Sequence, residues 1–229
     1  MAKALLIDVE ELHFEWGRDI DIGILREALA THPDIKAVLV THNETSTGVT
    51  NDLASISRVV KKEFGKLLLV DAVSSLGSVE LKTDDWECDV VAAGSQKGLL
   101  TPPGLSVISF SESAWRAYEK SSMPKYYNDL GLFRTFMGIG QTAFTPAISL
   151  LYALDKSLEL ILREGLDSFI DMQREQAFMI RSKVRSLGLG LLAEDRCASH
   201  SVTAVKVPEN VNADDLVDLL LDEYNIVVG

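Results

Sequence analysis

The stretch Val90-Val91-Ala92-Ala93-Gly94-Ser95-Gln96-Lys97-Gly98 decides the fold of this chain, together with Val70-Asp71-Ala72-Val73 upstream of it. Each stretch lies where a short apolar run changes abruptly to polar residues or glycine. Strands that are apolar without alternation are typical of a parallel sheet covered on both faces. Ligands bind such sheets beyond the carboxyl ends of the strands. We therefore expect Asp71 and Lys97 at one ligand-binding edge of a sheet.

The neighbouring sequence predicts more of this sheet. Residues 37–41 and 66–70 are further apolar runs, and residues 105–110 continue the sheet after 90–93. Asn51 or Asp52 begins a helix between the first two runs and Gly65 ends it. That helix places four apolar residues on one face: Leu53, Ile56, Val60 and Phe64. A strand, helix and strand in this order predict a right-handed crossover between parallel strands.

The second half of the chain changes character after Pro146. Apolar residues at helical spacing predict a long helix over residues 148–161, with a break at Gly165 and a second helix over 166–187. A strand at 201–207, a helix at 213–221 and a strand at 225–228 are predicted to follow. The predicted fold class is α/β: a mostly parallel sheet sandwiched by helices over residues 1–145, then a linking helix and the start of a small α+β C-terminal domain over 146–229.

Composition and charge favour an enzyme domain that acts on small molecules. The 229 residues carry 22 basic and 34 acidic side chains, a net charge of -12, which disfavours nucleic acid and anionic membrane surfaces as partners. The two cysteines have no CxxC spacing, which indicates a reducing, cytoplasmic location. The start of the chain meets acidic residues too soon for a signal peptide, and no apolar run approaches membrane-spanning length.

Lys97 and Asp71 together suggest imine chemistry with pyridoxal phosphate. A lysine amine attacks a carbonyl only when desolvation or a neighbouring positive charge lowers its pKa, and a strand end beside an apolar core offers desolvation. The cofactor withdraws electrons only while its pyridine nitrogen keeps a proton, which a nearby carboxylate favours. Lys97 is therefore the candidate imine-forming residue, and Asp71 is the candidate partner of the ring nitrogen.

Three stretches resemble the class V aminotransferases, most closely the alanine or serine:glyoxylate branch. They are Thr41-His42-Asn43-Glu44-Thr45-Ser46-Thr47-Gly48-Val49, Val70-Asp71-Ala72-Val73-Ser74-Ser75-Leu76-Gly77, and Gly94-Ser95-Gln96-Lys97 through Pro102-Pro103-Gly104. The resemblance implies fold type I, a homodimer, and transfer of an amino group from alanine or serine to glyoxylate or pyruvate. It also implies that this chain is truncated at both ends, and the family's arginine for the substrate carboxylate would lie beyond Gly229.

The resemblance assigns a role to several positions. Lys97 would form the Schiff base and move the proton, and Asp71 would hold the pyridinium. Val73 would pack on the ring and Thr45 would bond near the cofactor hydroxyl. The remaining candidates, Gln96, Ser95 and Thr142, would contact the phosphate. Thr142 would do so from the neighbouring subunit.

Plainer interpretations stay open for these residues. Asp71 could cap a turn, Val73 could belong to the core, and Thr45 could satisfy loop backbone groups. Gln96 could be a surface side chain. The segment that carries Thr142 could be a simple helix entry in which Thr145 is the cap.

Two functional alternatives also stay open. The first is an inactive scaffold or dimerisation piece of such an enzyme. The second is a related lyase such as a cysteine desulfurase, which would need a mobile reactive cysteine. No metal is expected, because the H-x-E element at His42-Asn43-Glu44 lacks the P-C-x-x-C motif that accompanies it in zinc deaminases. We interpret His42 as a hydrogen-bonded residue at the end of a strand.

Overall fold

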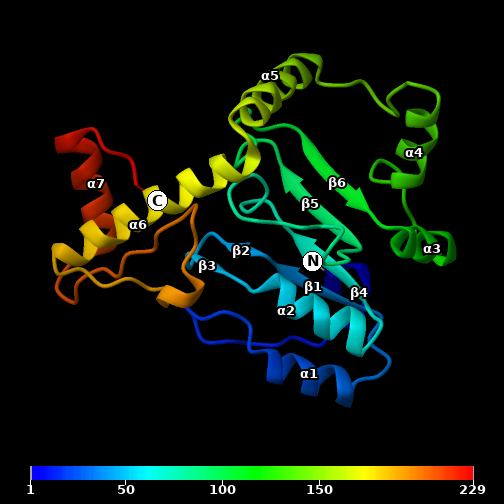
Figure 1. The fold of residues 1–229 in the computed structure, drawn as a ribbon, viewed down its shortest axis with the longest axis horizontal. Coiled ribbons are helices and arrows are strands. Elements are labelled where there is room, and N and C mark those ends of the chain that lie inside the picture. Colours follow the sequence, from blue (N-terminus) through cyan, green and yellow to red (C-terminus); the bar gives the residue numbers. More distant parts are fainter. Residues whose placement is uncertain (1, 229) are drawn as a thin grey trace.

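The computed structural model describes residues 2–228 (Figure 1). In chain order the elements are η1 Ala2–Leu5, α1 Ile22–Thr31, β1 Ala37–Thr41, β2 Asn43–Glu44, β3 Val49–Thr50, α2 Leu53–Ser57, η2 Arg58–Glu63, β4 Leu67–Asp71, β5 Val90–Gly94, β6 Ser106–Phe110, α3 Glu112–Lys120, α4 Leu130–Gly138, α5 Ile148–Glu164, α6 Leu166–Ser186, η3 Asp195–Cys197 and α7 Ala213–Tyr224.

A four-stranded sheet forms the centre, in the order β1-β4-β5-β6. β1 pairs in parallel with β4, and β4 pairs in parallel with β5. β6 runs antiparallel to β5 at the edge, where the two arrows point in opposite directions (Figure 1). The prediction of an α/β fold with a mostly parallel sheet flanked by helices is confirmed. A short hairpin of β2 and β3, which the sequence analysis did not predict, follows β1.

The hydrophobic core lies between one face of the sheet and the helices α1, α2 and η2. Leu68 and Val70 point into it from β4, and Ile56 and Val60 meet them from the covering helices. These four side chains are at most 2% exposed, and burial of each one stabilises the fold by about 1.5–3 kcal/mol. The core side chains lie on alternate positions of each strand, as the period of a β-strand requires.

The opposite face of the sheet corrects one expectation. The apolar run 37–41 predicted a strand covered on both faces, yet Leu39 of β1 is 75% exposed while its neighbour Val40 is 4% exposed. Successive side chains of a strand point to opposite faces, so Val40 reaches the core. Leu39 points to a face that no element within residues 2–228 covers at this position.

The predicted helix after Asn51 is present, and Asp52 is its cap. The Asp52 carboxylate accepts a hydrogen bond from the backbone N–H of Ser55 at 3.0 Å. After Ser57 the helix continues as one π-helical stretch, η2, and the chain leaves it at Gly65 with φ +62°. Asn51 instead uses its amide to join Thr41 and Ile20.

The C-terminal half contains the three predicted helices, α5, α6 and α7. Gly165, with φ +85°, separates α5 from α6. Thr145 is not the cap of α5, because Ala147 holds that position and makes no side-chain bond to the helix. Within the described part of the chain, no helix is long and apolar enough to cross a membrane.

The two strands predicted in this half are wrong. Residues 201–207 form only an isolated bridge between Val205 and Leu191, and residues 225–228 form no ladder. Asn225 takes a left-handed conformation, φ 54°, and ends α7. A run of β-branched residues becomes a strand only when a neighbour supplies a continuous hydrogen-bonded edge. Residues 201–207 have only isolated backbone bonds to their neighbours, such as those of Ala204 and Lys206 with residues 190–192.

Candidate active site

Three loops follow the carboxyl ends of β1, β4 and β5. The strand ends are tied to one another, since the backbone N–H of His42 donates to the carbonyl of Asp71 at 2.9 Å and that of Ala72 donates to Ala92 at 2.8 Å. The hairpin with Thr45, the turn with Asp71 and the turn with Lys97 therefore start from one sheet edge. This is the edge at which ligands bind in open α/β sheets.

Asp71 is the last residue of β4 and begins a tight turn. One carboxylate oxygen, Oδ1, accepts a hydrogen bond from the backbone N–H of Val73 at 2.9 Å. This bond is the turn-capping interaction that the sequence analysis left open. The second oxygen, Oδ2, has no hydrogen bond to any of residues 2–228, and the side chain is half-buried. One oxygen thus holds the turn, and the other remains available to a ligand.

Lys97 lies in a loop whose geometry depends on Ser95. The Ser95 side chain is 0% exposed; its hydroxyl donates to the carbonyl of Pro102 at 2.7 Å and accepts from the N–H of Leu105 at 3.2 Å. These two bonds close the loop that displays Gln96 and Lys97. Because both are internal, they favour a structural role for Ser95.

The two side chains displayed by this loop are exposed. Gln96 folds back over the end of β5, where a Cβ on Gly94 would lie 2.7 Å from its Oε1. Lys97 makes no ion pair and donates no side-chain hydrogen bond within the described chain. The desolvated surroundings expected for this lysine are therefore not provided by residues 2–228.

Two glycines bring the Asp71 turn against the Lys97 turn. Gly77 has φ +82°, and a Cβ on it would lie 2.7 Å from the carbonyl oxygen of Gly98. A Cβ on Gly98 would meet the Leu76 carbonyl and would lie 2.6 Å from Ser78 Oγ. Neither position has room for a side chain. The glycines at these two positions therefore let the two backbones touch.

Thr45 lies at the exposed tip of the β2–β3 hairpin, and Thr142 lies far from it. The hairpin turn is closed by Glu44, whose carboxylate accepts from the N–H of Ser46 at 2.9 Å. Thr142 is exposed in the connection between α4 and α5. In Figure 1, α4 projects on the side of the molecule away from the hairpin. The structure therefore does not bring Thr142 together with the other candidate residues of this chain.

His42 differs from its sequence-based interpretation. Its backbone is hydrogen-bonded, but its side chain is 2% exposed and its Nδ1 has no partner. The ring lies edge-on to Trp86, with 6.1 Å between the ring centroids. Burial lowers the pKa of His42 to about 4, so the imidazole is neutral at physiological pH. Among residues 2–228, no group of three or more histidine, cysteine or acidic side chains could hold a metal ion.

The two cysteines are unsuited to nucleophilic chemistry. Cys88 and Cys197 are both free and buried. Burial raises the pKa of the Cys88 thiol to about 11 and also raises the pKa of Cys197. A thiol that stays protonated in a packed interior is a poor nucleophile. Neither residue therefore supports a desulfurase reaction.

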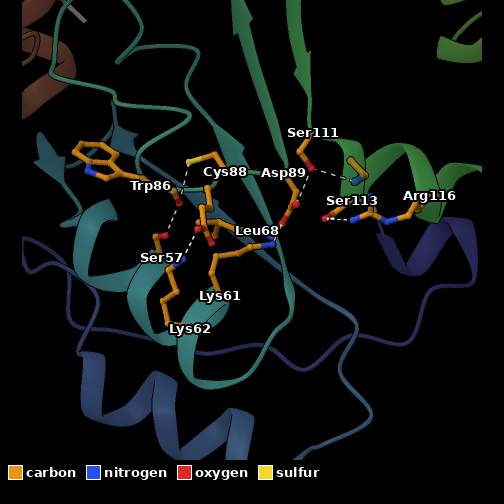
Figure 2. Close-up of polar contacts among 12 residues, drawn as sticks. Ser57, Lys61, Lys62, Leu68, Trp86, Cys88, Asp89, Ser111, Ser113 and Arg116 are labelled. Atoms are coloured by element: carbon orange, nitrogen blue, oxygen red, sulfur yellow. Dashed lines mark hydrogen bonds and ion pairs between the residues drawn. The ribbon is translucent and has the colours of Figure 1, made fainter.

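A second polar cluster, centred on Asp89, lies at the opposite end of β5 (Figure 2). Asp89 is 2% exposed and pairs with the Lys61 ammonium. It also accepts from the N–H of Leu68 at 2.8 Å and from Ser111 Oγ at 2.7 Å. A cavity of about 300 Å³ adjoins this cluster. Because Asp89 precedes β5 and Lys97 follows it, this cavity is separate from the candidate active site.

The fold is that of an α/β protein, and the hairpin and the two turns form its candidate ligand site at one sheet edge. Over residues 1–229 the chain matches the family described as aminotransferase class-V. It belongs to the class V aminotransferase family, which confirms the resemblance seen in the three sequence stretches.

The chain is also similar to curated proteins and to a solved structure over nearly all of its length. The chain is 40% identical to the soluble hydrogenase 42 kDa subunit of Anabaena cylindrica, covering 100% of this chain and 60% of that protein. It is 35% identical to the L-aspartate–glyoxylate aminotransferase of Paracoccus denitrificans, covering 97% and 57%. The crystal structure of an alanine–glyoxylate aminotransferase from Nostoc sp. superposes with a TM-score of 0.92 at 33% identity, covering 97% of this chain and 59% of that one. The chain thus spans about 60% of the length of these proteins.

Sequence reasoning missed residues that hold the site together. The buried residues Asn43 and Ser74 form a hydrogen-bond network with the exposed Ser201 behind the hairpin and the Asp71 turn. Asn43 and Ser74 lie inside the stretches that carry the family resemblance, but nothing in the pattern links them to Ser201. Such a link depends on tertiary structure and has no local signal in the sequence.

Proposed function

We propose that this chain forms the cofactor-binding part of a pyridoxal phosphate-dependent aminotransferase. The reaction would move an amino group from a small amino acid, alanine or serine, to an oxo acid, glyoxylate or pyruvate. The observation that carries this proposal is the backbone contact of Gly77 with Gly98, which holds the Asp71 turn against the Lys97 turn. Its relatives include proteins named as glyoxylate aminotransferases, which supports the choice of oxo acid.

Lys97 and Asp71 fit the two functions that the cofactor requires. Lys97 is exposed and unpaired within the described chain, so its amine can reach a bound aldehyde, and it would move the proton during transfer. Asp71 keeps one free carboxylate oxygen, which would hold the protonated pyridine nitrogen. Pyridoxal phosphate, when bound, supplies an electron sink for the amino group's carbon.

The other candidates would complete the cofactor's contacts. Val73, two residues after Asp71 and half-buried, would pack on the ring, and Thr45 would bond near its hydroxyl. Gln96 would contact the phosphate directly. Ser95, whose hydroxyl is engaged within its loop, would act by holding that loop in place.

We also propose a homodimer, in which Thr142 reaches the phosphate of the neighbouring subunit. Next to Thr142, Phe144 packs against an aromatic cluster of Tyr126, Tyr127 and Phe133. Tyr126 is 79% exposed and Tyr127 is 62% exposed. Exposed aromatic groups of this kind favour a protein interface.

The free, buried cysteines suit a cytoplasmic enzyme. The division into residues 1–145 and 146–229 remains our proposal for its domains.

An inactive scaffold or dimerisation piece is the second candidate function. It is favoured by the exposure of Lys97, because an imine-forming lysine needs desolvation to lower its pKa. A scaffold would keep the fold and the aromatic cluster and would perform no transfer.

Release of an oxo acid distinguishes the two candidates. The purified chain is incubated with pyridoxal phosphate and then with L-alanine or L-serine, and the oxo acid product is measured. The aminotransferase proposal predicts product equivalent to the bound cofactor, abolished by Lys97→Ala. Cofactor binding without product from either donor would contradict it. A well-folded chain that binds no cofactor would support the scaffold function instead.

A further inference from the structure

Residues 198–204, which we name the brace, lie against the hairpin that carries Thr45. Ala198 forms a bridge with Val49, and the N–H of Ser199 donates to the carbonyl of Gly48 at 2.8 Å. Gly48 has φ +67°, and a Cβ there would lie 3.2 Å from the N of Ala204. The hairpin and the brace are therefore packed backbone against backbone.

The same brace is hydrogen-bonded to the Asp71 turn through Asn43. The Asn43 amide donates to Ser74 Oγ at 2.8 Å and to Ser201 Oγ at 3.1 Å. Ser74 Oγ donates back to the carbonyl of Asn43 at 2.7 Å, and Ser201 Oγ donates to the carbonyl of Ser74 at 3.2 Å. Ser74 lies three positions after Asp71, inside the turn that Asp71 begins. The three side chains thus join hairpin, turn and brace.

Ser199 fixes the shape of the brace and ties it to α6. It is 0% exposed, and its hydroxyl accepts from the N–H groups of Ser201 and Val202 at 3.1 and 3.2 Å. Its carbonyl accepts from Arg181 Nη1 at 2.8 Å. Arg181 belongs to α6, so the contact extends from the long helix to the sheet edge.

Two of the three residues in this network are buried, and Ser201 is exposed. Asn43 is 3% exposed and Ser74 is 7% exposed. When one partner of a buried hydrogen bond is removed, the other is left without water and without a partner, which costs more than the bond itself contributes. The bonds also support one another, so their effects are not independent.

We infer that Asn43 and Ser201 are positioning residues through which the brace sets the geometry of two cofactor loops, the Thr45 hairpin and the Asp71 turn. We assign to both residues an indirect role, through the hairpin and the turn that they hold. The inference rests on the proposed function for its consequence, since a change in the Asp71 turn alters cofactor binding only if Asp71 holds the cofactor. The brace itself is a property of the cofactor-free chain and can be tested there.

Backbone hydrogen exchange of the cofactor-free chain is the first test. The variants are Asn43→Ala, Ser201→Ala and the double substitution. Asn51→Ala is the matched control, because Asn51 is also a buried amide at this hairpin but bonds Thr41 and Ile20 instead. We expect exchange at residues 72–76 to rise about tenfold in each single variant, with no further rise in the double, and to stay unchanged in Asn51→Ala. Because Ser201 is exposed, we expect Ser201→Ala to fold. Unchanged exchange at residues 72–76 in this variant would overturn the inference.

Cofactor affinity is the second test. The dissociation constant of pyridoxal phosphate is measured from its absorbance, first for the unmodified chain. Loss of the side-chain hydrogen bonds of either residue should weaken binding about fivefold to tenfold in Asn43→Ala and Ser201→Ala, and Asn51→Ala should stay within about twofold. Faster exchange with unchanged affinity would overturn the positioning role. If the unmodified chain bound no cofactor, the proposed function would fail for this chain, and the exchange test would still decide the brace.

Discussion

Gly77 and Gly98 lie in backbone contact, and a Cβ on Gly77 would be 2.7 Å from the carbonyl oxygen of Gly98. One glycine ends the turn that begins with Asp71, and the other follows Lys97 directly. The contact therefore fixes the spacing of the two residues on which the proposed chemistry depends. It also explains why small residues are needed at two positions that themselves carry no functional group.

Substitution of Gly98 tests this contact. In Gly98→Ala the new methyl group would meet the Leu76 carbonyl and Ser78 Oγ, so the two turns must separate. We expect a loss of about 1–3 kcal/mol in the free energy of unfolding and weaker cofactor binding. Gly138→Ala is the control, because no atom lies within 4 Å of a Cβ at that position. Urea unfolding gives the free energy of unfolding of both variants. An equal change in Gly98→Ala and Gly138→Ala would contradict the role of the contact.

The buried imidazole of His42 predicts a pH-dependent stability. Burial lowers its pKa from 6.5 to about 4, so between these values the unfolded chain binds more protons than the folded one. The stability due to neutral His42 is complete above about pH 6.5 and is lost as the pH falls toward 4. We expect His42 to account for about 2 kcal/mol of destabilisation between pH 7.5 and pH 5. In His42→Phe, the free energy of unfolding in urea should fall by about 2 kcal/mol less between pH 7.5 and pH 5 than in the unmodified chain. An equal fall in both proteins would argue against a neutral buried ring.

The protonated state of the cysteines predicts slow thiol modification. Cys88 and Cys197 are buried, and burial raises the pKa of each thiol. In the native chain at neutral pH, we expect a thiol reagent such as Ellman's to modify both at least tenfold more slowly than in the urea-unfolded chain. Rapid modification of either thiol in the native chain would reopen the desulfurase alternative.

Asp89 predicts a stability effect without a direct effect on the active site. Asp89→Ala leaves the Lys61 ammonium without its partner in a largely buried position, and breaking such a pair costs about 3–5 kcal/mol. Lys62→Ala is the matched control, since Lys62 pairs with Glu87 on the surface, where a pair contributes about 1 kcal/mol or less. Thermal or urea unfolding compares the two. If Asp89→Ala lowered the free energy of unfolding no more than Lys62→Ala does, the buried-pair interpretation would be wrong.

The sheet edge could be predicted from the sequence because its signals are local. The apolar runs of β1, β4 and β5 each end at a polar or glycine residue, and a strand, helix and strand give the direction of the chain. Asp71 and Lys97 were therefore predicted at the correct strand ends. Leu39 shows the limit of this reasoning: an apolar residue at a strand position predicts burial, but burial depends on what else covers that face.

The network behind the site could not be predicted, because its partners are far apart in the chain. Asn43 and Ser201 are separated by 158 positions, and a serine and an asparagine have no pattern that reveals a long-range partner. The false strand at 201–207 has the same origin. Its Val and Thr residues suit an extended backbone, and tertiary contacts use that extended segment as the brace instead of as part of a ladder.

The proposed function depends above all on an imine between Lys97 and pyridoxal phosphate in this chain. The most direct measurement mixes the purified chain with the cofactor, reduces the mixture with borohydride, and locates the adduct by mass spectrometry. We expect one adduct per chain, on Lys97, that is absent from Lys97→Ala. A well-folded chain that gives no adduct, or adducts spread over several lysines and unchanged in Lys97→Ala, would contradict it.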